Sequence, residues 1–474
     1  MLKLTPKVHT IVRDYLFHKS RVQELTDGLG SPLNILFPQL ASDNAKAFLE
    51  VFHKHKIKGR VFCAHKPNKS QAIVRRLASE NVGMDVASHG ELLSALQAGF
   101  VGERLEATGP KNEKFIRLAL QHGVVIAIDS TDELFLISKV LSRLMLTEAR
   151  VLLRISGFTS PHTKVHGRDT RFGINLKDLD ATYQWLRDHK EIKFLGLSFH
   201  LNAANTTEKT IAIENTLNAL VKASLYGLSP SIISIGGGFH ISYLESAEEW
   251  DTYISALKKS VLEEMEALSW DQSGLGYRNE NGTLDGSAQF ADSFVSHTVS
   301  EEFEKILESP LPLFDNTAFK QILDELLFEL WIEPGRAILD QAGMTVARVL
   351  SVTRSAMDET VVILDMNRSN LNSQDLMVLA DPTIVYQKPK EHPESAGVFF
   401  AGNLCLKSDL LTRHKTYLDQ LPEPGDLVIF HNTAAYMMDF AESHTLQQDI
   451  AKKVAITKID ETFTWALDDN YEPL

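Results

Sequence analysis

The sequence Val61-Phe62-Cys63-Ala64-His65-Lys66-Pro67-Asn68 is the clearest indication of both architecture and chemistry in this chain. It begins as a short apolar run and ends in a lysine followed by a proline. Proline disfavours helix and pushes the residue before it toward an extended conformation. We therefore predict that Lys66 stands at the end of a buried strand, either as a solvated surface residue or as a group held in a pocket for chemistry.

The composition excludes several classes of protein. The chain has 474 residues and a net charge of −14, which argues against a nucleic-acid partner. It contains no apolar run of membrane-spanning length and begins without a signal-peptide pattern, so we expect no membrane association and a cytoplasmic location. The only two cysteines, Cys63 and Cys405, exclude a disulfide scaffold and CxxC-type metal sites, and we expect no metal.

Strand and helix patterns alternate eight times, which is typical of a parallel sheet with helical crossovers. Helical periodicity separates the strands, with the seventh helix expected over residues 247–268. Eight units of this size predict a (β/α)8 TIM barrel over residues 39–340, with an open doubly wound sheet as the alternative. The candidate strands are Arg60–His65, Gly83–Ala87, Leu105–Thr108, Val124–Asp129, Val151–Ile155, Phe194–His200, Ile232–Ile235 and Phe328–Ile332.

Three segments depart from this rhythm. Residues 341–474 show β-rich runs separated by Pro- and Gly-bearing turns, which predicts a C-terminal antiparallel β-domain. Residues 1–38 form an N-terminal segment whose strand at Leu33–Phe37 is expected to join that domain. A Gly-, Asn- and Ser-rich insertion near residues 270–318 interrupts the barrel; a lid, a partner surface and a tolerated surface insertion are all consistent with it.

Polar residues gather at the ends of the predicted strands, where TIM barrels carry their active sites. An amine, carboxylates, a guanidinium, an imidazole and a glycine-rich turn should therefore share one face. The residues concerned are Lys66, Asp85, Arg154, His200, Gly236, Gly237, Gly238, Glu333, Gly335 and Arg336.

These residue types indicate a phosphorylated, ring-containing cofactor. The glycines could approach a phosphate closely and Arg336 could bind it, although a plain turn and a structural ion pair are the alternatives. Glu333 ends an apolar run and needs a buried partner, such as a protonated pyridine nitrogen. His200 is either a satisfied core residue or a ring that stacks on the cofactor. With Lys66, the set suggests pyridoxal 5'-phosphate; cofactor-free Schiff-base aldolases have less need of the carboxylate and the phosphate site.

Several stretches, taken in their order and spacing, resemble the fold type III pyridoxal phosphate-dependent decarboxylases, a family of diaminopimelate, ornithine and arginine decarboxylases with alanine racemase as a distant relative. The chain is similar to a divergent member. The matching stretches are Ala64-His65-Lys66-Pro67-Asn68, residues 83–92, Thr108-Gly109-Pro110-Lys111, Asp129-Ser130 with Glu133-Leu134, Arg171-Phe172-Gly173-Ile174, Gly236-Gly237-Gly238-Phe239, Glu333-Pro334-Gly335-Arg336, residues 402–409 and Ala434-Ala435-Tyr436.

The resemblance implies a role for each of these positions. Lys66 would hold the cofactor as a Schiff base, His200 would stack on its ring, and Glu333 would bind the pyridine nitrogen. Cys405 would reach the partner subunit's cofactor in a head-to-tail homodimer and act as an acid near Cα. The other cofactor-binding residues implied are Asp85, Arg154, Gly236, Gly237, Gly238, Gly335, Arg336 and Tyr436.

Two departures from the family pattern bear on the substrate. The histidine is followed by Leu201-Asn202-Ala203 in place of Val-Gly-Ser, so Asn202 or Asn205 would have to replace a serine hydroxyl. After Cys405, the acid that binds a distal amine in the basic amino-acid decarboxylases is replaced by Leu406, which precedes Lys407. We therefore expect an amino-acid-like substrate with altered distal recognition, acidic, modified or carrier-attached, with Leu406 and Asp409 near it.

Three functions are consistent with these features. The first is a pyridoxal phosphate-dependent amino-acid decarboxylase acting through Lys66. The second is an amino-acid racemase or epimerase on the same fold, which needs two bases on opposite ring faces; the sequence shows no tyrosine that matches the racemase pattern. The third is a non-catalytic regulator that resembles these enzymes, against which the retention of Lys66, Glu333 and Cys405 argues.

Overall fold

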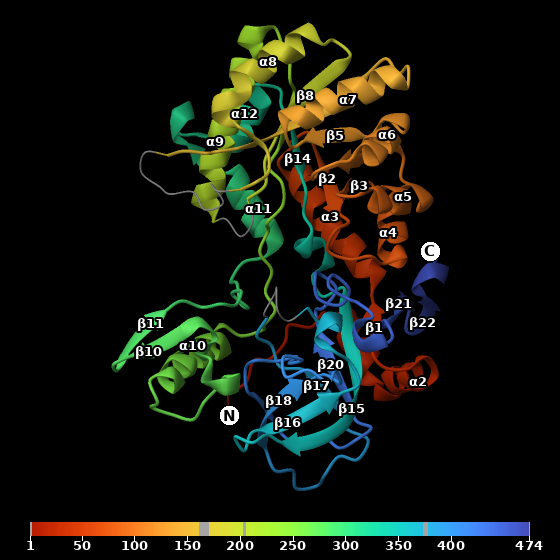
Figure 1. Ribbon diagram of the computed structural model, residues 1–474, viewed down its shortest axis with the longest axis vertical. Helices are drawn as coiled ribbons and strands as arrows, with labels where there is room; N and C mark the ends of the chain where they lie inside the picture. Colours follow the sequence, from red (N-terminus) through yellow and green to blue (C-terminus); the bar gives the residue numbers. More distant parts are fainter. Residues whose placement is uncertain (1, 161–169, 202–204, 373–377, 474) are drawn as a thin grey trace.

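The computed structural model describes residues 2–160, 170–201, 205–372 and 378–473 and contains two sheets of nine strands each. One sheet forms a barrel surrounded by helices in the upper part of Figure 1, and the other forms a β-domain in the lower part. Among the described residues, no helix combines the length and the apolar character that crossing a bilayer would require.

Eight parallel strands close into the barrel. Around it they pair in the order β5-β4-β3-β2-β14-β9-β8-β6, and β6 pairs with β5 to complete the ring. Closure confirms the predicted (β/α)8 barrel and excludes the open doubly wound sheet. The strands are β2 (Gly59–Ala64), β3 (Gly83–Val86), β4 (Leu105–Ala107), β5 (Val125–Ile128), β6 (Ala149–Ser156), β8 (Ile192–Ser198), β9 (Ile232–Ser234) and β14 (Glu329–Ile332), with the short β7 (Ile174–Asn175) beside β6.

Local sequence signals start the helices that cover the barrel. Ser70, Ser88, Asn112 and Ser130 each accept a hydrogen bond from the backbone N–H three residues on, which satisfies one of the free donors of a helix N-terminus. The covering helices are α3 (Pro38–Lys54), α4 (Gln71–Ala78), α5 (His89–Gln97), α6 (Glu113–Gln121), α7 (Thr131–Arg143), α8 (Leu179–Asp188), α9 (Thr206–Ala223), α11 (Val299–Leu307) and α12 (Phe319–Glu325).

The barrel interior changes from apolar to polar along the strands. A buried cluster of Phe62, Val125, Leu152, Ile232 and Trp331 fills one end. Because side chains alternate along a strand, the residues two positions further on face the same interior. On three of these strands those residues are Arg154, Ser234 and Glu333. The barrel interior is therefore apolar at one end and polar at the end where the strands have their carboxyl termini.

After β9 the chain leaves the barrel. The helix expected over 247–268 forms as α10 (Ala247–Val261), but its buried face packs in a separate cluster with Leu4 and Leu379 and not on the barrel. The hairpin of β10 (Tyr277–Glu280) and β11 (Thr283–Gly286) follows beside it (Figure 1). The helix period predicted that one face of α10 is buried; it could not say against which partner.

The chain returns to the barrel wall through α11, which lies within the interval predicted as an insertion. Phe303 of α11 packs edge-on against Phe52 of α3 and against Phe239, with ring centroids 5.1 and 5.8 Å away. The short pair β12 (Pro310–Leu311) and β13 (Thr317–Ala318) then leads to α12 and β14. The wall before β14 is therefore built by α11 and α12.

The β-domain combines both ends of the chain. Strand β1 (Leu33–Leu36) lies between β15 (Gly343–Arg354), antiparallel, and β21 (Lys452–Ile459), parallel. Most pairs are antiparallel; β16 and β18 form a second parallel pair. The remaining strands are β16 (Thr360–Leu364), β17 (Thr383–Val385), β18 (Ala396–Ala401), β19 (Thr416–Leu418), β20 (Leu427–His431) and β22 (Thr462–Leu467), and helices α1 (Thr10–Phe17) and α2 (Lys19–Leu29) precede β1.

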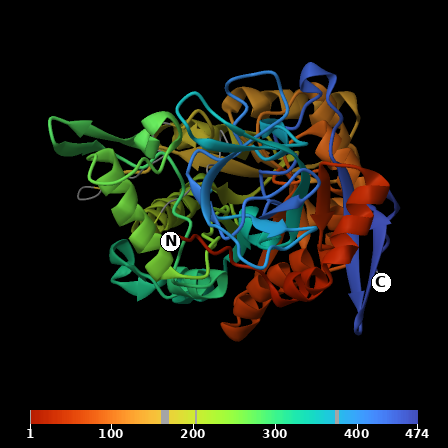
Figure 2. The same cartoon turned by 90° about the horizontal axis from the view of Figure 1, so that it is seen from below.

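Two ribbons extend from the body on opposite sides. Figure 2 shows the β10–β11 hairpin on one side and the β21–β22 ribbon, with the C-terminus, on the other. The β-domain and the barrel meet between them, where the backbone N–H of Tyr436 donates to the carbonyl of Pro67 at 2.9 Å. This contact places a residue of the β-domain beside the loop that carries Lys66.

Candidate active site

Lys66 lies at the barrel mouth on a loop held by both neighbouring strands. The N–H of His65 donates to the carbonyl of Asp85, and the N–H of Ala64 donates to the carbonyl of Pro334. These bonds carry the parallel pairing of β2 one step past its end, so Lys66 emerges at a defined point. It is exposed, and its Nζ lies 6.0 Å from the centroid of the Tyr436 ring. Lys66 is therefore a solvent-accessible amine on a loop whose backbone is fixed by hydrogen bonds.

Three carboxyl groups lie below Lys66: Glu106 of β4 and Glu333 at the end of β14 are buried, and Asp85 of β3 is half-buried. Asp85 accepts a 2.5 Å hydrogen bond from Thr108 Oγ1, and Glu333 accepts a 2.6 Å bond from Ser234 Oγ. Both carboxylate oxygens of Glu106 are buried without a hydrogen-bond partner. Burial raises the pKa of Asp85 to about 6 and that of Glu333 to about 7, while burial and the two neighbouring acids raise the pKa of Glu106 well above its usual range.

The cations near this acid cluster are exposed, as Lys66 is, or paired with other acids, as Lys111 is with Glu133. Arg154 is already shared, because its Nη1 lies 3.4 Å from Asp129 Oδ1 and its guanidinium stacks 4.7 Å from the Phe172 ring centroid. A buried carboxylate without a cation or donor is costly. A ring cation such as a protonated pyridine nitrogen would supply the missing charge at Glu333, so the residues present fit that group.

The glycine turn after β9 is crowded on both sides by backbone. Gly236 has a φ of +67°, and a Cβ there would lie 2.5 Å from the Phe199 carbonyl oxygen. A Cβ on Gly237 would lie 2.4 Å from the Glu333 carbonyl oxygen. Only glycine fits at either position. The turn therefore brings backbone close to Glu333 and leaves room for an anion to approach its N–H groups.

His200 is a neutral imidazole at this turn. Its Nδ1 accepts a 3.3 Å hydrogen bond from the N–H of Gly237, which places the ring proton on Nε2. Burial, with Lys66 and Arg154 nearby, lowers the pKa of His200 to about 3. An uncharged flat ring of this kind suits stacking on a cofactor and not general acid chemistry at neutral pH.

Arg336 and Tyr436 approach the same mouth from the other side. The guanidinium carbon of Arg336 lies 5.1 Å from the Tyr436 ring centroid, and its Nη1 donates to the Tyr243 hydroxyl at 2.7 Å. Tyr436 holds a left-handed backbone with a φ of +64°, which is an uncommon conformation for an aromatic residue. A Cβ on Gly335 would lie 3.2 Å from the Tyr436 hydroxyl. These residues and the glycine turn together could hold a phosphate.

The loop of residues 402–409 forms a separate part of the candidate site, in the β-domain. Cys405 and Leu406 are exposed at its tip. Asp409 is buried, and its two carboxylate oxygens accept 2.8 Å bonds from the N–H groups of Arg368 and Leu404. These bonds shape the loop, and they favour a structural role for Asp409 over the substrate contact predicted from sequence.

Two asparagines, Asn202 and Asn205, were predicted to replace a serine hydroxyl near the cofactor, and the structure describes one of them. Asn202 lies outside the described residues. Asn205 is the N-cap of α9: its Oδ1 accepts from the N–H of Glu208, and its own N–H donates back to the Glu208 carboxylate. Its side-chain oxygen is therefore used by the helix.

Several supporting residues were missed by sequence reasoning. Thr108 and Ser234 donate to the acids, Tyr243 holds Arg336, and Lys209 Nζ donates to the Gly238 carbonyl at 3.1 Å. Glu106 carried a visible signal, because an acid inside an apolar strand is expensive to bury. The other four are common polar residues whose roles depend on contacts that no sequence pattern reports.

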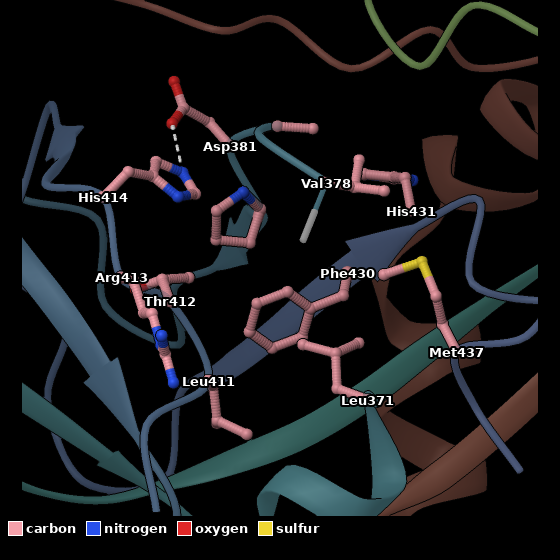
Figure 3. A pocket seen from close by; sticks show the side chains of 12 residues that line it. Leu371, Val378, Asp381, Leu411, Thr412, Arg413, His414, Phe430, His431 and Met437 are labelled. Atoms are coloured by element: carbon pink, nitrogen blue, oxygen red, sulfur yellow. Dashed lines mark ion pairs between the residues drawn. The ribbon is translucent and has the colours of Figure 1, made fainter. Parts of the chain in front are cut away.

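A small cavity elsewhere contains none of the predicted site residues. It lies in the β-domain and is lined by Leu371, Phe430 and Met437 on one side and by polar groups on the other (Figure 3). Asp381 Oδ1 and His414 Nε2 face each other there at 4.0 Å. The site built around Lys66 is distinct from this cavity.

Comparison with known proteins places the chain. The pyridoxal-binding domain of the pyridoxal-dependent decarboxylases matches residues 42–273, and the C-terminal sheet domain of the same decarboxylases matches residues 205–434. Diaminopimelate decarboxylase of Bacillus subtilis is 24% identical over 89% of this chain and 85% of its own. The L-glutamyl-[BtrI acyl-carrier protein] decarboxylase of Niallia circulans is 25% identical over 80% of this chain and 79% of its own.

A solved structure shares the architecture described above. Diaminopimelate decarboxylase of Helicobacter pylori, in complex with L-lysine, superposes with a TM-score of 0.69 over 94% of this chain and 95% of its own, at 19% identity. That likeness supports the fold, and the two domain matches support the chemistry. The chain belongs to the fold type III pyridoxal 5'-phosphate-dependent decarboxylases, is a carboxy-lyase and takes pyridoxal 5'-phosphate as its cofactor.

Proposed function

We propose that this decarboxylase acts on an amino acid whose distal end is neutral or anionic, either free or attached to a carrier. The observation that carries the proposal is the loop tip. Asp409 is the only acid in residues 402–409, and backbone N–H groups occupy both of its oxygens. The exposed side chains that follow Cys405 are Leu406, Lys407 and Ser408, none of which is an acid that could form an ion pair with a distal ammonium group.

The residues at the barrel mouth suit a set of binding roles. Lys66 holds the cofactor covalently, Glu333 binds its ring nitrogen, and His200 covers a ring face. The phosphate is held by the glycine turn, Arg336 and Tyr436, with Asp85, Arg154 and Gly335 completing the cofactor's surroundings. The cofactor, when bound, supplies an electron sink for the charge left when CO2 departs.

A carboxylate at Glu333 is effective because it sits in a dry, preorganised environment. Its partner Ser234 is buried, and the hydrogen bond between them fixes one oxygen of the carboxylate. Burial and the neighbouring Asp85 disfavour ionisation of Glu333. A ring nitrogen that keeps its proton would stabilise the ionised form of this carboxylate. Glu333 thus serves to keep that nitrogen protonated.

We infer that a second copy of the chain completes the site. Cys405 is an exposed thiol at the tip of a loop whose base is held by Asp409. Protonation at Cα needs an acid close to the substrate, in a space from which water is excluded. A head-to-tail homodimer, in which each Cys405 enters the partner's barrel mouth, would meet both needs. Cys405 is unpaired, which suits the reducing cytoplasm as the place of action.

The Niallia circulans relative supports an acidic or acyl-linked substrate, because its name records a glutamyl group on a carrier protein. Lys407 at the exposed tip could contact a distal carboxylate or a phosphate-bearing tether.

A substrate panel tests the proposal. CO2 release would be measured for diaminopimelate, lysine, ornithine and arginine, and for glutamate, aspartate and a glutamyl thioester of a carrier mimic. We expect the highest kcat/KM within the second group. A preference for any substrate with a distal ammonium would overturn the proposal, and change of substrate chirality without CO2 release would indicate a racemase.

A further inference from the structure

A second chemical site lies beside the glycine turn. His240 follows that turn by two residues, His297 precedes α11, and Glu302 lies within α11. The potential ligand atoms of these three side chains lie within 4.8 Å of one another. We propose that they bind one divalent transition-metal ion, of which Zn²⁺ is the representative.

The distances suit a tetrahedral ion. His240 Nδ1 lies 2.9 Å from Glu302 Oε1, and His297 Nε2 lies 3.7 Å from Glu302 Oε2. Ligands about 2.0–2.1 Å from zinc in a tetrahedron stand about 3.3 Å apart, between these two values. The two distances end on different oxygens of Glu302, so the side chains must move for one carboxylate oxygen and both imidazoles to share an ion. The three ligand atoms already lie within 4.8 Å of one another. Two imidazoles and one carboxylate form a ligand set that suits zinc, cobalt and nickel.

The carboxylate is oriented by groups that are not themselves ligands. The backbone N–H of His240 donates to Glu302 Oε2 at 2.8 Å, and Lys209 Nζ lies 3.6 Å from Glu302 Oε1. Glu302 and Lys209 are buried, whereas the His240 and His297 side chains are 34% and 41% exposed. The carboxylate ligand is therefore held in place by buried groups, and the exposed histidines allow an ion to enter from solvent.

Lys209 sets the strength of binding. Its charge lies next to Glu302 and would oppose a nearby divalent ion. We therefore expect affinity in about the micromolar range, weaker than a structural zinc site. Three protein ligands also leave one coordination position for water or a small anion, as in open zinc sites. Lys209 also contacts the Gly238 carbonyl, so the ion would sit one contact away from the phosphate-binding turn.

The sequence could not indicate this site. His240 and Glu302 are separated by the whole excursion that contains α10 and the β10–β11 hairpin, and no CxxC- or HxxxH-type spacing links the ligands. The site exists because α11 returns to the barrel wall beside the end of β9, next to α9 and α3 (Figure 1).

Metal titration tests the inference. Untagged, chelator-washed, cofactor-loaded full-length protein would be titrated with ZnCl2 by calorimetry, and with CoCl2 while visible absorption is recorded. We expect one equivalent to bind and the cobalt form to show the intense bands of a tetrahedral ion. His297→Ala should weaken zinc binding at least tenfold, since removing one of three ligands costs that much or more.

Matched variants keep the result interpretable. His122→Ala removes an exposed histidine outside the cluster and should leave zinc binding unchanged. Glu302→Gln keeps the shape of the side chain and should abolish the cobalt bands, with thermal melting used to check that the variant folds. The inference is overturned if the full-length protein shows no saturable binding, or if His297→Ala binds zinc as tightly as the parent protein.

Discussion

The acids at the barrel mouth and the loop tip of the β-domain, which we propose act on the same substrate, lie in opposite environments: the first is largely buried and the second is exposed. Glu106 and Glu333 are buried by the strands of one chain and Asp85 beside them is half-buried, while the nearby cations Lys111 and Arg154 are paired with other acids. Cys405 and Leu406 stand at the surface on a loop held from below by Asp409. The proposed cofactor site lies within one chain, whereas we propose that a second copy of the chain encloses the loop tip.

This difference explains why the cofactor end is the more predictable one. A buried carboxylate must be matched by a specific partner, which leaves few chemical choices. An exposed loop tip tolerates many side chains at little cost to stability, so its residues can change with the substrate. The two regions should therefore respond differently to substitution.

The largest effect is expected at Lys66. Lys66→Ala removes the amine proposed to bind the cofactor and should lower kcat by about 10³-fold or more, which corresponds to at least about 4 kcal/mol of transition-state stabilisation. Absorption spectra of the dialysed variant should lack the protein-bound cofactor band. Lys69→Ala, a nearby exposed lysine, is the control. Retention of the band in Lys66→Ala would show that another residue binds the cofactor.

The next effect tests whether the exposed half works in a partner. Cys405→Ala should lower kcat about 10²-fold if the thiol is the acid at Cα. Co-refolding equal amounts of Cys405→Ala and Lys66→Ala should restore about a quarter of parental activity, because half of the dimers are mixed and each contains one intact site. No recovery in a mixture shown to contain mixed dimers would mean that Cys405 and Lys66 act within the same chain.

A smaller effect is expected in the pH dependence of stability, through the buried acid Glu333. Because the folded pKa of Glu333 is raised to about 7, its contribution to stability is present at low pH and lost as pH rises from about 4.5 to 7. In cofactor-free protein, Glu333→Gln should remove part of this loss, a gain on the order of 2 kcal/mol at pH 8 relative to pH 5.

Urea unfolding of the parent protein and of Glu333→Gln at both pH values measures that difference. Ser234→Ala is the matched control, because it removes the bond to Glu333 but keeps the carboxyl group. When the cofactor is bound, the parent protein should be more stable to urea than Glu333→Gln at pH 8. An equal pH dependence in the parent protein and in Glu333→Gln would show that Glu333 does not titrate in this range.

The smallest effect lies at the loop tip. Leu406→Asp supplies a carboxylate beside Cys405 and should raise kcat/KM for diaminopimelate about tenfold, equivalent to about 1.4 kcal/mol from one charge-assisted hydrogen bond. Leu406→Asn has a similar size without the charge and should give little gain. Equal gains in both variants would mean that space at the tip, and not charge, sets substrate choice.

The eight barrel strands were predictable because a buried parallel strand leaves a short apolar run, and helical patterns separated the successive runs. The sequence predicted that the strand at Leu33–Phe37 joins the C-terminal domain, but its place between β15 and β21 is visible only once both ends of the chain are in place. The helix α10 shows the limit of periodicity, since its buried face meets Leu4 and Leu379 and not the barrel.

The sequence by itself singled out the candidate site residues whose neighbours restrict their backbone or their charge. These are Lys66 before a proline, glycines 236 and 237 in a crowded turn, and Glu333 at the end of an apolar strand. Those demands are local, so they can be read from neighbouring residues. Only the tertiary structure decided that Glu106 joins two other acids, that Asp409 serves its own loop, and that His240, His297 and Glu302 meet. Such groupings join positions far apart in the chain, and sequence order alone says nothing of their distance in space.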